Sequence, residues 1–126
     1  MARRKVLVIE NEASIRGALF AMLARLECET ETADNGTEAL AKIHHDQFDA
    51  VLVDLRCAHL QAEVVIPQIH NLQPSLVGRV LVITGDVPDA RSLKLIEEYF
   101  LLKVPQNRLS EDLQGYLRAI LRVRPV

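Results

Sequence analysis

Polar side chains follow four of the five short apolar runs in this sequence. They are Glu10 and Asn11 after the first run, Asp54 after the third, Thr84 after the fourth and Lys103 after the fifth. Carboxylate and amide oxygens are the ligands that Mg²⁺ prefers, and such a cluster leaves room for a phosphoryl group. Asp54 could then act as the nucleophile that forms an acyl phosphate, with Thr84 donating a hydrogen bond and Lys103 supplying positive charge. Each of these residues alone is an ordinary polar residue at the end of a strand. They indicate a functional site only if they lie together at the same edge of the sheet.

The apolar runs themselves are typical of strands that are buried on both faces of a parallel sheet. Between them, apolar residues recur at helical spacing. Five such alternations with short connections predict right-handed crossovers and one open α/β sheet with helices on both faces. Ligands bind beyond the carboxyl ends of the strands in these sheets, which is where the polar residues would meet. The expected strands cover 6–9, 28–33, 50–53, 80–83 and 100–102, and the expected helices cover 13–26, 64–72 and 88–98, with two more that begin at Thr37 and Ser110.

Three residues concern the ends of these helices. Thr37 and Ser110 are expected to be the caps of the second and last helices, because a side-chain hydroxyl can accept from the free N–H groups of a first turn. Pro67 falls within the third helix, and it is expected either to open that helix or to kink it.

The composition argues against several classes of function. The 126 residues suit a single domain, expected to span 1–126 with a core at about 5–121. A net charge of −2, 4% aromatic residues and no Trp argue against direct nucleic-acid binding. No run approaches the length of a membrane span or of a secretion signal, so a cytoplasmic location is expected. Cys28 and Cys57 lack metal-ligand spacing and are expected to be free thiols.

Taken together and in order, these motifs resemble the receiver domain of two-component response regulators, from Lys5 to about Leu121. Each motif alone is weakly specific. The matching segments are VLVIENE (6–12), TADNGTEAL (32–40), FDAVLVDLR (48–56), LVITGD (81–86) and FLLK (100–103). The first segment, residues 83–89 and a short fourth helix are similar to receivers fused to hybrid histidine kinases, with stand-alone receivers as the second option.

The resemblance implies a flavodoxin-like fold with strand order 2-1-3-4-5. It also implies that Asp54 accepts a phosphoryl group from the phosphohistidine of a histidine kinase. Mg²⁺ would be held by Glu10, Asn11, Asp54 and the backbone carbonyl of Arg56. Such a domain is not a conventional enzyme, since it would catalyse only its own phosphorylation and dephosphorylation.

The remaining roles implied by the resemblance concern signalling. Thr84 and Lys103 would contact the phosphoryl group, and Thr84 and Phe100 would form a switch in which the aromatic ring turns inward as the threonine moves. The Arg56 side chain is expected at the rim of the site, where it would either slow or favour attack by water on the acyl phosphate. The implied partners are a histidine kinase or a phosphotransfer domain, with a homodimer as a further candidate; neither nucleic acid nor membrane is expected.

The sequence also departs from the family pattern. The second acidic residue after the first strand is replaced by Asn11, which brings no charge and predicts weaker metal binding. Lys103 is usually followed directly by a proline, but here Val104 precedes Pro105. Thr84 and Lys103 are 19 positions apart (103 − 84), a few fewer than the family norm.

Two alternatives to a phosphoacceptor remain. One is a degenerate receiver that acts as a phosphorylation-independent interaction module, and Asn11 and Val104 favour it. The other is a small nucleotide- or flavin-binding protein, which is disfavoured because residues 10–14 after the first strand contain no glycine.

Overall fold

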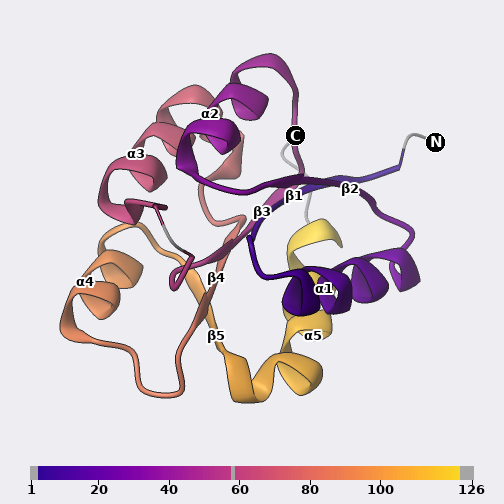
Figure 1. Cartoon of the computed structure of the whole chain (residues 1–126). Coiled ribbons are helices and arrows are strands. Elements are labelled where there is room, and N and C mark those ends of the chain that lie inside the picture. The colour runs from indigo at the N-terminus through magenta and orange to yellow at the C-terminus, as the bar shows by residue number, and fades with distance from the viewer. Residues whose placement is uncertain (1–2, 58, 123–126) are drawn as a thin grey trace.

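The computed structural model describes residues 3–57 and 59–122, so both ends of the predicted domain lie outside the described residues. The described chain forms a five-stranded sheet in the order β2-β1-β3-β4-β5, and every neighbouring pair is parallel (Figure 1). The predicted flavodoxin-like strand order is confirmed. The strands are β1 (Lys5–Ile9), β2 (Glu29–Ala33), β3 (Ala50–Asp54), β4 (Val80–Thr84) and β5 (Leu102–Pro105).

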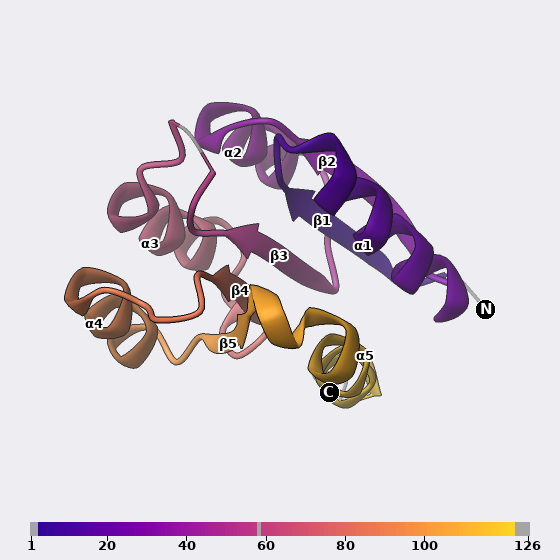
Figure 2. The same cartoon turned by 60° about the horizontal axis from the view of Figure 1, so that its bottom comes forward.

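Helices cover both faces of this sheet. One apolar cluster joins β1, β3 and β4 to α1 and α5, and a second joins the opposite face of these strands to α2, α3 and α4. Figure 2 shows the two layers on either side of the strands. No helix in the described part of the chain is both long and apolar enough to cross a membrane. The helices are α1 (Ala13–Arg25), α2 (Gly36–His45), α3 (Ala62–Leu72), α4 (Ala90–Glu98) and α5 (Leu109–Arg122), with short 3-10 turns η1 (Pro74–Leu76) and η2 (Gln106–Arg108).

The strand that differs from its prediction is β5. It was expected at 100–102 with Lys103 beyond its end, but it begins at Leu102 and includes Lys103. The cause is the end of α4, where the Leu101 N–H donates to the Ile96 carbonyl at 3.0 Å and Phe100 adopts a left-handed conformation with φ 55°. This arrangement is a Schellman motif, which uses two residues after the helix cap to reverse the chain. Leu101 is buried in the core as a result, and neither it nor Phe100 belongs to the sheet.

The predicted helix caps were also wrong. Asn35 caps α2, because its Oδ1 accepts from the Glu38 N–H at 2.9 Å, so Thr37 lies inside the helix. Ser110 also lies within its helix, which begins one residue earlier. Pro67 is inside α3, which continues through it, so it does not open that helix at its first turn.

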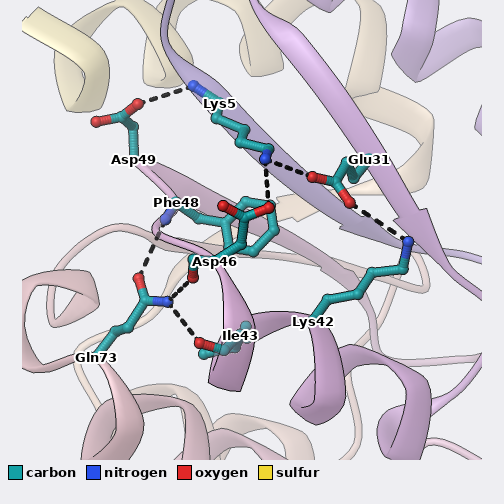
Figure 3. Close-up of polar contacts among 8 residues, drawn as sticks. All are labelled: Lys5, Glu31, Lys42, Ile43, Asp46, Phe48, Asp49 and Gln73. Carbon is teal, nitrogen blue, oxygen red and sulfur yellow. Dashed lines mark hydrogen bonds and ion pairs between the residues drawn. The ribbon is translucent and has the colours of Figure 1, made fainter.

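The end of the sheet where the strands begin is held together by polar contacts (Figure 3). The buried Gln73 side chain accepts from the Phe48 N–H at 3.1 Å and donates to the carbonyls of Ile43, at 2.8 Å, and of Asp46. The Lys5 ammonium pairs with the Asp46 carboxylate at 2.5 Å. These contacts bind the first strand to the connections after α2 and α3. The opposite end of the sheet carries the predicted site.

Candidate functional site

Asp54 is the last residue of the central strand β3, and its side chain is only 4% exposed. Glu10 directly follows the neighbouring strand β1 and is equally buried, with its N–H bonded to the Ala33 carbonyl at 3.1 Å. Since Ile9 and Val53 are paired in register, the next residue of each strand lies side by side. The structure therefore brings these two carboxyl groups together, as the sequence predicted.

Of the two carboxyl groups, that of Glu10 is the harder to ionise. Burial, together with a hydrogen bond to Asp54, raises the pKa of Glu10 to about 7. Its Oε1 accepts from the Glu12 N–H at 2.9 Å, whereas its buried Oε2 has no donor among the described residues. When both carboxyls are ionised, neither can supply a hydrogen to the other. A proton or a cation at Oε2 would relieve that repulsion.

Arg56 provides the cation at this site. Its Nε lies 3.0 Å from Asp54 Oδ1, its Nη2 lies 3.0 Å from Oδ2, and its backbone N–H lies 2.9 Å from Oδ1. Burial by itself would raise the pKa of Asp54, but hydrogen bonds from Glu10 and Arg56 outweigh it and hold that pKa below its usual range. The sequence placed this side chain at the rim of the site. In the structure it is 37% exposed and forms a bidentate pair with the Asp54 carboxylate.

The third nitrogen of this guanidinium contacts a residue that follows another strand. Arg56 Nη1 donates to the side-chain oxygen of Gln106, the first residue after β5. Nothing in the sequence pattern indicates this contact, because the two residues are 50 positions apart and each is common on surfaces. The acidic pair, the arginine and this amide form one connected group at the carboxyl end of the sheet.

Thr84 ends β4 and is buried at the same end of the sheet. Its Oγ1 lies 2.8 Å from the Gly85 carbonyl, to which it donates. Thr84 is paired with Pro105 of β5, and not with Lys103. Thr84 thus lies at the carboxyl end of β4, as predicted, but Lys103 is not the residue paired with it.

Lys103 and Phe100 lie away from the acidic pair. Lys103 is an exposed residue within β5 that is paired with Val82, and its side chain makes no hydrogen bond or ion pair with the described residues. It is two strands from Asp54, about 10 Å at the usual strand spacing. Phe100 is 75% exposed in the turn after α4.

The donors at this site suit Mg²⁺ in number and type. Mg²⁺ usually takes one or two carboxylates, keeps several waters and leaves room for substrate phosphate. Glu10 and Asp54 supply two carboxylates, one with an oxygen that lacks a donor, and the exposed Asn11 directly follows the first of them. No group of three or more His, Cys, Asp or Glu residues that could hold a metal occurs among residues 3–57 and 59–122. A metal at Asp54 would share the carboxylate oxygens with the donors of Arg56.

Curated relatives of this chain are regulators of longer length. The chain is 30% identical over 121 residues to the probable transcriptional regulator ycf27 of Guillardia theta, covering 95% of the chain and 46% of that protein. It is 29% identical over 120 residues to the response regulator protein PilR of Pseudomonas aeruginosa, covering 94% of the chain and 27% of that protein. The chain therefore spans less than half the length of these relatives.

Solved structures agree on the fold. The chemotaxis protein CheY4 of Vibrio cholerae matches with a TM-score of 0.81 at 22% identity, over 95% of this chain and 100% of that one. The receiver domain of NtrC4 from Aquifex aeolicus matches with a TM-score of 0.77 at 26% identity, over 94% and 97%. The sequence pattern of the response regulator receiver domain matches residues 6–112. On this match, together with its sheet order, the chain belongs to the response regulator receiver domain family.

Proposed function

We propose that this domain is a phosphoacceptor switch in a two-component phosphorelay, with Asp54 as the residue that receives the phosphoryl group. The observation that carries the proposal is the buried Glu10–Asp54 pair at the carboxyl end of the two central strands. Family membership supports it, since receiver domains are signalling domains. The chemistry proposed for this domain is limited to its own phosphorylation and dephosphorylation.

In the transfer step, an Asp54 carboxylate oxygen forms a bond to phosphorus while the bond between phosphorus and the donor imidazole nitrogen breaks. The imidazole leaves with that electron pair. A carboxylate that stays ionised is a competent nucleophile, and the lowered pKa of Asp54 keeps it so. Thr84 would turn its hydroxyl from the Gly85 carbonyl to a phosphoryl oxygen.

Magnesium is the proposed cofactor. When bound, Mg²⁺ neutralises negative charge on a transferring phosphoryl group. Glu10 and Asp54 would hold it through their carboxylates, Asn11 through its amide oxygen and Arg56 through its backbone carbonyl. The Glu10 oxygen without a donor supports this assignment.

The proposed partners are a histidine kinase or a phosphotransfer domain as donor, and a downstream protein or a second copy of this chain as target. Thr84 and Phe100 remain the proposed switch pair. The exposed Phe100 ring, in the turn between α4 and β5, supports a role of that turn in contacts with partners. The predicted contact between Lys103 and the phosphoryl group is not supported, because Lys103 lies within β5 and is paired with Val82.

The second candidate is a degenerate receiver that binds partners without phosphorylation. The specific observation in its favour is that Arg56 engages both oxygens of Asp54. Incubation with acetyl phosphate and Mg²⁺, followed by intact mass measurement, separates the two functions. The phosphoacceptor gains the mass of one phosphoryl group, and the Asp54→Asn variant does not. No gain by the wild-type protein would favour the degenerate receiver.

A further inference from the structure

A positively charged side chain, that of Arg56, is paired with the carboxylate proposed to accept the phosphoryl group, so its role in the transfer rests on the proposed function. We propose that Arg56, and not Lys103, contacts the phosphoryl group on Asp54, and that Gln106 positions its guanidinium. Two guanidinium nitrogens of Arg56, Nε and Nη2, each lie 3.0 Å from an Asp54 carboxylate oxygen, so the guanidinium already contacts the atoms that would react.

The register of β5 removes Lys103 from this role. Lys103 pairs with Val82, which in turn pairs with Val53, the residue before Asp54. Lys103 therefore lies one residue short of the level of Asp54 and two strands away from it. It also lies two residues before Pro105, the residue that pairs with Thr84.

The geometry of Arg56 suits phosphate. A guanidinium is always charged and offers a planar fork of donors that matches both carboxylate and phosphate oxygens. When phosphorus bonds to one Asp54 oxygen, that oxygen loses its charge, and the negative charge moves to the phosphoryl oxygens immediately beyond it. The N–H groups of Arg56 that contact the Asp54 carboxylate would then need only a small movement to contact the phosphoryl oxygens.

Gln106 holds the fork in place. Its side-chain oxygen accepts from Nη1, the nitrogen that does not contact Asp54. Gln106 follows Pro105, the residue paired with Thr84, so the end of β5 presents an amide acceptor to Arg56. With one arm fixed to Gln106 and two on Asp54, the guanidinium is oriented before any phosphoryl group arrives.

The test compares initial rates of phosphorylation by acetyl phosphate, measured by intact mass at saturating Mg²⁺. Arg56→Ala should lower the rate by about tenfold or more, as loss of a charged transition-state donor does. Lys103→Ala and the matched control Lys94→Ala, which removes an exposed lysine of α4, should each change it by less than about twofold. Arg56→Lys, which keeps the charge without the fork, should fall between. A loss in Lys103→Ala as large as in Arg56→Ala, or a faster Arg56→Ala, would overturn the proposal.

A second measurement needs neither metal nor phosphoryl donor. In EDTA, the ¹⁵N NMR signal of Arg56 Nε should shift in Asp54→Asn and in Gln106→Ala but not in Lys103→Ala, and an unchanged signal in Asp54→Asn would refute the ion pair. If the wild-type protein takes no phosphoryl group, the proposed function fails and the role of Arg56 fails with it. If the wild type is phosphorylated and Arg56→Ala keeps its rate, only the role of Arg56 fails.

Discussion

Replacing Glu10 with glutamine should stabilise the protein at and above neutral pH and leave its stability nearly unchanged below pH 4.5. The change is nearly isosteric. The amide oxygen of Gln can accept from the Glu12 N–H, as Glu10 Oε1 does at 2.9 Å, and its NH₂ group can donate to Asp54 where Oε2 has no donor. Glu10→Gln therefore imitates the protonated state of Glu10 at every pH.

The magnitude follows from the pKa of Glu10, which is about 7 in the folded protein against an ordinary value of 4.5. A raised carboxyl pKa means that the folded state binds the proton more tightly than the unfolded state. Its contribution is therefore fully present below pH 4.5 and is lost as pH rises to 7. The difference corresponds to about 3 kcal/mol, which solvent screening at the open end of the sheet reduces to about 2 kcal/mol.

Urea unfolding in EDTA between about pH 5 and pH 8 measures this effect without a contribution from metal. The advantage of Glu10→Gln over the wild type should grow with pH and level off above 7. Glu97→Gln, which removes an exposed carboxylate on α4, is the matched control and should show no such growth. A Glu10→Gln advantage that does not vary with pH, or a loss of stability at pH 8, would refute the reasoning about the acidic pair.

Three further changes test the metal site and the core. Asn11→Asp should tighten Mg²⁺ binding about fivefold in calorimetry, because an added charge near a cation at an exposed site is worth about 1 kcal/mol; unchanged affinity would place residue 11 outside the metal site. Gly36→Ala should lower the free energy of unfolding in urea by about 2 kcal/mol, because its new Cβ would lie 2.7 Å from the Leu60 carbonyl oxygen. The control is Gly17→Ala, whose Cβ would meet open space and should not destabilise the protein. Gln73→Leu should lower the unfolding temperature by removing about 3 kcal/mol, because it leaves buried backbone groups without partners; a wild-type melting temperature would contradict this.

The fold could be predicted because its signals are local and repeated. Each central strand is a continuous apolar run, and burial on both faces leaves such a run few alternatives. The site positions at the carboxyl ends of β1, β3 and β4 could be predicted for the same reason: Glu10, Asp54 and Thr84 are fixed by where those strands end. The caps were less predictable, because Asn35 and Thr37 are both acceptable caps and only the backbone decides between them.

The contact between Arg56 and Asp54 was not predicted, although the two residues are two positions apart. A long side chain at that spacing can extend into solvent or fold back onto the carboxylate. In the structure the side chain folds back onto the carboxylate, and its Nη1 donates to Gln106, which belongs to another part of the chain. Sequence spacing shows which groups are near a site, but it does not show the hydrogen-bond partner that orients one of them.

The place of Lys103 has a cause that the sequence does contain. Moving β5 by two residues would keep every side chain on its face and would put Leu102 where Val104 is now buried, so the apolar pattern permits either register. The length of the chain between Thr84 and β5 decides between them. The turn closed by Leu101 and Ile96 ends directly before Leu102, so β5 begins there and Lys103 lies two residues before Pro105, the residue paired with Thr84. The shortened segment therefore moves the lysine away from the acidic pair, and the cation beside Asp54 must come from its own loop.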